Sequence, residues 1–423
     1  MTPRLLLWLD RSSLAATLIL PPLFMHARGI AEGVIALIDL AFLLRCALTN
    51  DWSWLRSTWV RVGAAWWLWL TICSIPGIGV GGTNSFVQAL VQFRFLLFVA
   101  ALETTILAAP MARKWLQYVL AASALYIAAQ TWLQFATGKN LGGYPRLGGG
   151  ELTGPFMHPR AAAPLSRLLF PTMLPVLDRL ITQGKRLAPL LLAITGIGTI
   201  VLIGQRMPLL LTVFGLVITA YLLPRLRPPL VIAMAAGAIL LAATPIVSPP
   251  TFNRLVTLFS SQMAQFANID YGQMAIRAVV ITADHPVMGL GYDGFRNACP
   301  DPQYFRGWTA AFPDGGAAAS CNIHPHNHYL EAATNAGIPG LILFSTLICL
   351  WLRGLATNLG ADPLRVGLFV SALIQEWPIA AHSGYSAVEI AGFFFLIVGY
   401  GLALSRAAAK TAATSPSQGN SIT

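Results

Sequence analysis

The feature that most constrains this chain is a series of apolar stretches, each near the roughly 20 residues that a helix needs to cross a bilayer. The twelve stretches lie at about 12–27, 29–48, 60–76, 85–108, 115–135, 161–181, 187–204, 207–223, 229–247, 337–352, 364–381 and 386–404. Only 10% of the residues are charged, against about 25% in a typical soluble domain. Mean hydropathy is +0.65. We therefore predict an all-α polytopic membrane protein with about 12 transmembrane helices.

The loops between these stretches predict the orientation and the organisation of the chain. Lysine and arginine concentrate before the first stretch, in the even-numbered connections and in the tail, and such an excess marks cytoplasmic loops. Both termini are therefore expected to be cytoplasmic. The expected segments are helices 1–9 in 1–247 with a smaller outer loop at 136–160, a large outer loop at 248–336 with helical character at 260–289, helices 10–12 in 337–406, and a disordered tail at 407–423.

The distribution of charge argues against a nucleic-acid partner, and the positions of the cysteines bear on whether the large outer loop lies in an oxidising compartment. The net charge is +11, but the basic residues are scattered and form no patch that would favour nucleic acid. Cys299 and Cys321 are the two cysteines of the large outer loop, whereas the other three lie in or beside apolar stretches. An oxidising compartment would pair them in a disulfide, and two unpaired thiols whose side chains point apart are the alternative.

Three histidines gather in "HPHNHYLEAATNAGIPG" at 324–340, at positions 324, 326 and 328. A zinc site needs convergent ligands, and the chain contains neither an HExxH nor a CxxC pattern. A neutral imidazole can instead take a proton from an attacking hydroxyl near pH 7, which favours a general base. Asn327 either orients such a ring or a sugar hydroxyl, or caps a following helix. We predict no metal and no cofactor.

Arginines on the outer face are candidates for binding an anionic group. Arg206 lies at the outer end of the eighth stretch, where the positive-inside preference would not place it. It either extends to lipid headgroups or binds phosphate with its two parallel donors. Arg277 lies among apolar residues of the large loop, and Arg146 lies in the smaller one. The chain has no D-x-D pair to hold a cation on a diphosphate, so arginines would supply the counter-charge.

The stretch "HNHYLEAATNAGIPG" at the end of the large loop, with His326-Asn327 followed by Gly337 and Gly340, resembles the signature of the bacterial O-antigen ligases. The same superfamily includes O-antigen polymerases and O-oligosaccharyltransferases. The resemblance extends through "GQRMPLL" around Arg206, "AIRAVVITADHPVMGLGYDGF" and "LTGPFMHPRAAA". It covers most of the second half of the chain, and its motifs are more specific for the superfamily than for the ligase branch.

The resemblance implies a membrane glycosyltransferase of the GT-C type in the bacterial inner membrane, with the large periplasmic loop capping the active site. Such a ligase transfers O-antigen polysaccharide from undecaprenyl pyrophosphate to the lipid A-core oligosaccharide in lipopolysaccharide biosynthesis, with inversion and without metal or nucleotide. His326 matches the essential histidine, and Arg206 and Arg277 match the arginines that hold the pyrophosphate. Asn327, Arg146 and His328 complete the expected substrate-binding set. The expected partners are these two lipid-linked substrates and membrane lipids, with a monomer as the working assumption and no nucleic acid.

Three other functions stay open from the sequence. An O-antigen polymerase or a protein O-oligosaccharyltransferase would use the same histidine and arginines with a different acceptor. A secondary transporter would use Arg206 and Arg94 as substrate-binding charges. Transporters of this size tend to contain two similar halves, and no internal repeat is visible here.

Overall fold

The computed structural model describes residues 3–158, 161–304, 321–381, 384–385 and 388–414 of the 423-residue chain. Every regular element in these ranges is a helix, which confirms the predicted all-α class. Two isolated β-bridges, Pro76 with Gly79 and Lys139 with Pro145, are confined to loops.

The helices of the first half are α1 (Pro3–His26), α2 (Arg28–Thr49), η1 (Ser53–Arg56), α3 (Thr58–Cys73), α4 (Gly82–Val91), α5 (Phe93–Ala101), η2 (Leu102–Ile106), α6 (Pro110–Thr137), α7 (Ala162–Thr182), α8 (Leu187–Ile203) and α9 (Arg206–Leu222). Those of the second half are η3 (Pro224–Leu226), α10 (Arg227–Val247), α11 (Pro249–Phe252), η4 (Asn253–Thr257), α12 (Leu258–Ala264), η5 (Phe266–Asn268), α13 (Asp270–Asp284), α14 (Gly294–Ala298), η6 (Pro302–Tyr304), α16 (His328–Ala356), α17 (Pro363–Gln375) and α18 (Val388–Thr414).

Each predicted apolar stretch coincides with a helix or, for 85–108, with the three consecutive helices α4, α5 and η2. Among the described residues, five helices are long and apolar enough to cross a membrane: Gly82–Ile106, Pro110–Thr137, Pro224–Val247, His328–Ala356 and Val388–Thr411. Three shorter helices, α8, α9 and α17, are also apolar. These helices are consistent with a polytopic membrane protein. The count of 12 spans and the GT-C type stay predictions.

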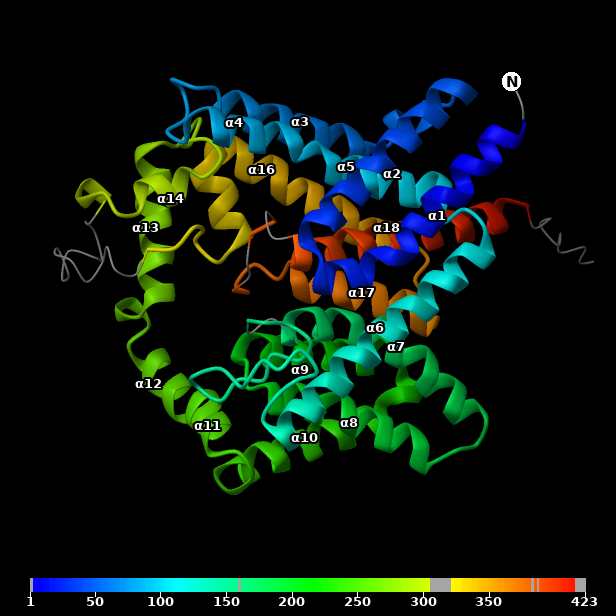
Figure 1. Ribbon diagram of the computed structural model, residues 1–423, viewed down its shortest axis with the longest axis vertical. Coiled ribbons are helices and arrows are strands. Elements are labelled where there is room, and N and C mark those ends of the chain that lie inside the picture. Colours follow the sequence, from blue (N-terminus) through cyan, green and yellow to red (C-terminus); the bar gives the residue numbers. More distant parts are fainter. Residues whose placement is uncertain (1–2, 159–160, 305–320, 382–383, 386–387, 415–423) are drawn as a thin grey trace, which may run out of the picture.

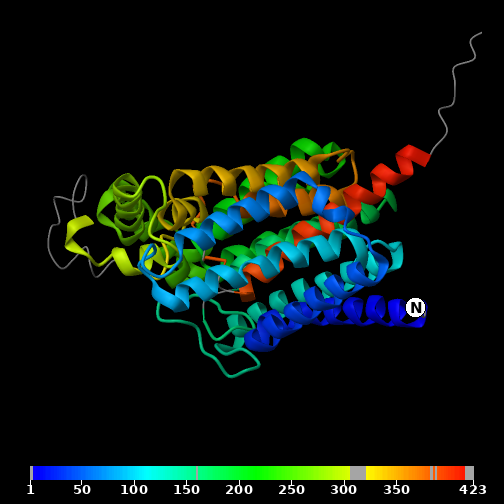
Figure 2. The ribbon, with the colours of Figure 1, turned by 90° about the horizontal axis from the view of Figure 1, so that it is seen from above.

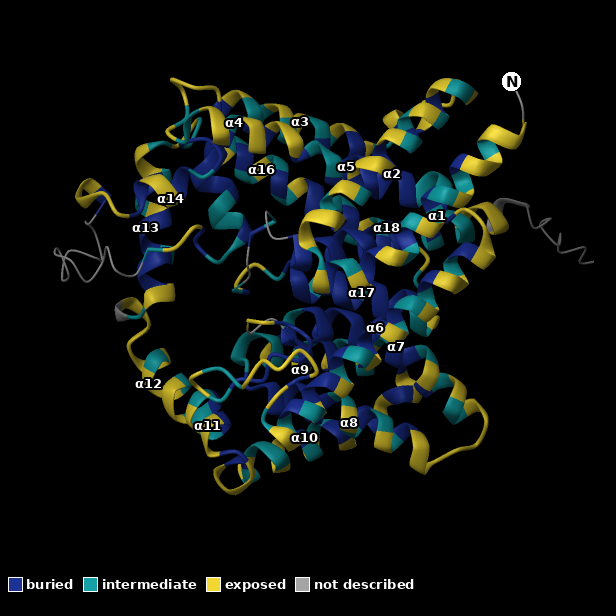
Figure 3. Cartoon of the chain, in the orientation of Figure 1, coloured by how far each residue is buried: buried dark blue, intermediate teal, exposed yellow. Residues whose placement is uncertain are grey.

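The helices run side by side as a bundle, and the segments between α10 and α16 gather at one end of it (Figures 1 and 2). The beginning of α1 and the end of α18 lie at the other end. Buried residues concentrate in the middle of the bundle, and the helices α11 and α12 at its edge are largely exposed (Figure 3). The large loop is thus separated from both chain ends by the length of the bundle.

A close contact between α7 and α17 organises the centre of the bundle. A side chain at Gly367 would place its Cβ 2.7 Å from the backbone of Phe170, so only glycine allows the two helices to lie this near. Small residues permit such approaches between membrane helices. The contact fixes the end of α17, which leads to the site described below.

Three boundaries differ from those predicted. The helical region 260–289 is broken into α12, η5 and α13, because the chain turns back at Phe266 so tightly that a Cβ at Gly272 would overlap its carbonyl oxygen. A first helical segment of α16 already begins at His328, and the second begins after the non-helical backbone of Ala336 and Gly337, close to the predicted start near residue 337. The alanine-rich end of α18 stays helical to Thr414, so residues 407–414 are not disordered, and residues 415–423 lie outside the described ranges.

Gly337 and Gly340 mark the point where α16 is interrupted. Gly337 has a φ of +65°, and a Cβ there would lie 2.3 Å from the carbonyl oxygen of Val287. The backbone N–H of Ile338 donates to the carbonyl of Pro286 at 2.7 Å. The interruption therefore lets the "DHPVMG" segment pack directly against the backbone of α16.

Cys299 and Cys321 form a disulfide with a Cα–Cα distance of 5.8 Å, which resolves the alternative left open by the sequence. Denatured, unreduced protein is therefore expected to present three reactive thiols, those of Cys46, Cys73 and Cys349, and five after reduction. A count of five without reduction would contradict the pairing. Because the bond joins residues 22 apart, the Cys299→Ser/Cys321→Ser double variant should be less stable by about 3 kcal/mol, measured as a lower Tm in detergent.

Candidate functional site

His326 is the most exposed ring of the histidine cluster, and its backbone is strained. It has a φ of +54°, a left-handed conformation that costs a non-glycine residue about 1–3 kcal/mol and is enriched at functional sites. Its Nε2 lies 3.1 Å from the Nδ2 of Asn322. Since an amide nitrogen donates, Nε2 accepts and carries the lone pair that a general base needs. The ring centroid lies 5.2 Å from that of Tyr271 and 4.3 Å from that of His324.

His324 stabilises the left-handed backbone of His326 by a hydrogen bond. Its ring is buried, and its Nδ1 accepts a hydrogen bond from the backbone N–H of His326 at 3.3 Å. Burial, together with the smaller effects of the nearby His326 and His328 rings, lowers the pKa of His324 from 6.5 to about 3. His324 therefore stays neutral near pH 7 and acts as an uncharged acceptor beside His326.

Asn327 caps α16, as one of the two sequence interpretations predicted. Its Oδ1 accepts from the backbone N–H groups of Tyr329 and Leu330, both at 3.0 Å. Its Nδ2 donates to the carbonyls of Pro378 at 2.7 Å and Ala380 at 3.3 Å. The same side-chain amide thus caps the N-terminus of α16 and attaches it to the segment after α17.

His328 is buried in the first turn of α16. Its Nδ1 lies 3.1 Å from Oε2 of Glu376, and its ring stacks on Tyr385 with centroids 4.1 Å apart. The Tyr329 hydroxyl donates to the carbonyl of Glu376 at 2.7 Å. The three histidines therefore have three different environments, and they do not converge on one point as metal ligands would.

Sequence reasoning missed the buried polar groups beneath the cluster. Arg167 of α7 is 2% exposed, and it donates to the side chain of Gln375 and, at 2.7 Å, to the carbonyl of Ile390. Glu376 follows at the end of α17. The available signal was a charge inside an apolar stretch, which is rare and often functional. The pairing itself was hidden because 208 residues separate Arg167 from Gln375.

Arg206 contacts the helical arm that leads from α10 to α13. Its Nε donates to the carbonyl of Arg254 at 2.8 Å, its Nη1 donates to the side-chain oxygen of Gln262, and its guanidinium lies 5.9 Å from the ring centroid of Phe259. Arg254 in turn forms an ion pair with Glu151 of the smaller outer loop. The structure thus brings two arginines, from α9 and η4, to the base of the two outer loops.

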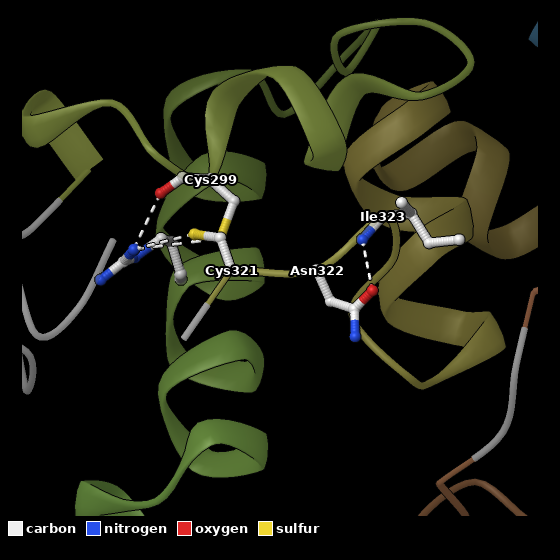
Figure 4. Close-up of a disulfide and its surroundings, with 5 residues drawn as sticks. Cys299, Cys321, Asn322 and Ile323 are labelled. Atoms are coloured by element: carbon white, nitrogen blue, oxygen red, sulfur yellow. Dashed lines mark hydrogen bonds between the residues drawn. A yellow bond between two sulfur atoms is a disulfide. The ribbon is translucent and has the colours of Figure 1, made fainter. Parts of the chain in front are cut away.

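The other predicted arginines have different surroundings. Arg146 donates to the carbonyl of Phe135 and lies 5.2 Å from its ring centroid. Arg277 is 1% exposed, and its Nη1 donates to the carbonyl of Cys299 at 2.8 Å and approaches the Cys321 sulfur at 3.3 Å. Burial lowers the pKa of this guanidinium. Figure 4 shows the disulfide that Arg277 contacts, joined to the stretch that leads to Asn322.

A cavity lies beside His328, between α3 and α16. It contains about 410 Å³ of empty space, part of it open to the outside, and its lining includes Trp66, Gln92, Tyr292, His328, Glu331 and Tyr385. Gly384 separates Glu331 from His324, because a Cβ there would lie 2.9 Å from the Glu331 carboxylate and 3.3 Å from the His324 ring. Carboxylates therefore lie on this side of His326, whereas Arg206 and Arg254 are the neighbours of its contact Tyr271.

The fold and site define an all-helical, membrane-embedded protein with a strained histidine and clustered arginines at one end of its bundle. Residues 191–345 match a family model described as O-antigen ligase. The match covers 155 of the 423 residues, and it confirms the predicted resemblance to the O-antigen ligase and polymerase superfamily. Members are glycosyltransferase-like enzymes, and the family implies lipid-linked glycans and membrane lipids as partners. A search of curated proteins gives no match.

Burial of His324 predicts a pH-dependent stability. The unfolded chain binds a proton below about pH 6.5, whereas folded His324 does so only near pH 3. The free energy of unfolding is therefore unaffected by this group above pH 6.5. It falls as the pH drops below that value, by about 2 kcal/mol at pH 5. Between about pH 7.5 and pH 5, the Tm of wild-type protein in detergent should fall more than that of His324→Gln. His158→Gln, at an exposed histidine, should behave as wild type, and equal slopes for all three proteins would contradict the assignment.

Proposed function

We propose that this protein is an O-antigen ligase, which transfers O-antigen polysaccharide from undecaprenyl pyrophosphate to the lipid A-core oligosaccharide at the periplasmic face of the inner membrane. The observation that carries the proposal is His326, which has an accepting nitrogen and lies between an arginine side and a carboxylate side. The matching family model is described as O-antigen ligase, which supports a glycan transfer of this general type.

His326 acts as the general base in the proposed reaction. An acceptor hydroxyl takes the place of the Asn322 amide at Nε2 and transfers its proton there as its oxygen attacks the anomeric carbon of the donor. The bond between that carbon and the pyrophosphate oxygen breaks, and undecaprenyl pyrophosphate leaves with the electron pair. Because base and leaving group lie on opposite sides of the carbon, the configuration inverts.

Arginines stabilise the charge that develops on the leaving group. At Arg206 a phosphoryl oxygen replaces the neutral oxygen of Gln262, so that the guanidinium faces an anion and can bind it with two parallel donors as negative charge develops. Arg277 contributes positive charge from behind the disulfide. Arg146 holds the smaller loop over the site through Phe135, and Asn327 and His328 act by fixing the position of His326.

Replacement of His326 tests the base. His326→Ala should lower the rate of transfer by about 10²–10⁴-fold, the usual contribution of a general base, and leave the Tm close to that of wild type. His158→Ala, at an exposed histidine of the smaller loop, should keep full activity. Near-wild-type ligation by His326→Ala would remove this residue from the mechanism.

Replacement of the arginines tests the donor site. Arg206→Ala and Arg277→Ala should each abolish transfer, whereas Arg206→Lys should keep part of it, because lysine retains the charge without the paired donors. Reactive thiols are counted in each variant. Loss of activity in Arg277→Ala together with five thiols in unreduced protein would show that Arg277 acts by supporting the disulfide and not by its charge.

Reconstitution distinguishes the proposed activity from its alternatives. Purified protein in liposomes is given undecaprenyl-pyrophosphate-linked O-antigen and lipid A-core, and the products are separated by gel electrophoresis. Glycan on the core supports a ligase. A longer lipid-linked glycan would show a polymerase, and uptake of substrate without either product would show a transporter.

A further inference from the structure

We propose that Tyr271 is a donor-binding residue, whose hydroxyl donates a hydrogen bond to the pyrophosphate of the lipid-linked donor while its ring packs against the base. The inference rests on the proposed function and deepens it, because it connects the residue that activates the acceptor with the residues that hold the leaving group. Sequence reasoning gave Tyr271 no role.

The position of Tyr271 sets it apart from the other tyrosines near the site. It lies in the first turn of α13 and is 48% exposed, whereas Tyr292 and Tyr304 are buried. Its ring is 5.2 Å from that of His326, at an interplanar angle of 58°. No hydrogen bond from its hydroxyl occurs within the part of the chain that the structure describes. The hydroxyl is thus available to a ligand beside the proposed base.

Besides contacting the His326 ring, Tyr271 interacts electrostatically with two arginines. Both Arg206 and Arg254 interact electrostatically with its hydroxyl group, and the backbone of Arg254 fixes the guanidinium of Arg206 through a 2.8 Å hydrogen bond. Three elements, α9, η4 and α13, therefore bring two cations and one neutral O–H donor to the same place. An anion with several acceptor oxygens matches this arrangement, as a pyrophosphate does.

The geometry of an inverting displacement is compatible with a donor-binding residue beside the base. The base and the leaving group lie on opposite sides of one sugar carbon, so their separation is fixed by the reaction. The Tyr271 ring contacts the His326 ring, and Tyr271 interacts electrostatically with Arg206 and Arg254, so a rigid side chain beside the base lies within the field of both cations. Its hydroxyl donates to an anionic oxygen, which keeps the hydrogen bond strong as negative charge develops.

Removal of the hydroxyl alone tests the inference. Tyr271→Phe keeps the ring that packs on His326, and it should weaken binding of undecaprenyl pyrophosphate to nanodisc-embedded protein by about 10–100-fold, the usual cost of a lost hydrogen bond to a charged group. The KM for the donor should rise, whereas the KM for lipid A-core should not change, a split that a purely structural role would not produce. Tyr221→Phe is the matched control, since that tyrosine is 78% exposed at the opposite end of α9 from Arg206.

A double-mutant cycle provides the second measurement. If Tyr271 and Arg206 bind the same pyrophosphate, the effects of Tyr271→Phe and Arg206→Lys on donor binding will be less than additive. Unchanged donor binding by Tyr271→Phe, in protein that transfers glycan normally, would overturn the inference and leave the proposed function standing. If Tyr271→Phe weakens donor binding but the wild type forms no product on lipid A-core, the inference is supported and the ligase assignment is overturned. Failure of the wild type to bind undecaprenyl pyrophosphate would overturn both.

Discussion

The attachment of the first turn of α16 to the end of α17 is the interaction on which the site depends. Asn327 donates to two carbonyls after α17, His328 pairs with Glu376, and the Tyr329 hydroxyl donates to the Glu376 backbone. Three consecutive residues thus bind one neighbouring segment. Because buried polar groups in a membrane-embedded bundle have little water to replace a lost partner, breaking one of these contacts would be costly. The turn is therefore held rigidly.

This rigidity explains how His326 keeps an unfavourable backbone. The residue before it in the cluster, His324, accepts its N–H, and the residue after it caps α16. A left-handed conformation persists only where the surroundings over-determine it, and both neighbours are fixed here. The strain turns the ring toward Asn322 and Tyr271 while the adjacent rings stay buried. The contacts that bury His324 and His328 therefore also hold His326 in the conformation that leaves its ring partly exposed.

The sequence predicted what local patterns encode and missed what depends on distant pairing. Apolar stretches predicted the helices, and an asparagine before α16 predicted its cap. The disulfide was one of two alternatives for the outer-loop cysteines, whereas the packing of Val287 against Gly337 is shown only by the structure. Contacts between residues far apart, such as Arg206 with Gln262 and Arg167 with Gln375, leave no periodic signal.

Three neighbouring imidazoles present an electrostatic problem that the fold resolves by giving each ring a different environment. Two protonated rings within 4.3 Å of one another would repel strongly. Burial holds His324 in the neutral form, and a carboxylate faces His328. His326 alone adjoins the exposed face with the arginines beyond Tyr271. The density of histidine therefore does not indicate shared chemistry, because the surroundings of each ring, and not its residue type, decide which one is placed to exchange a proton with a substrate.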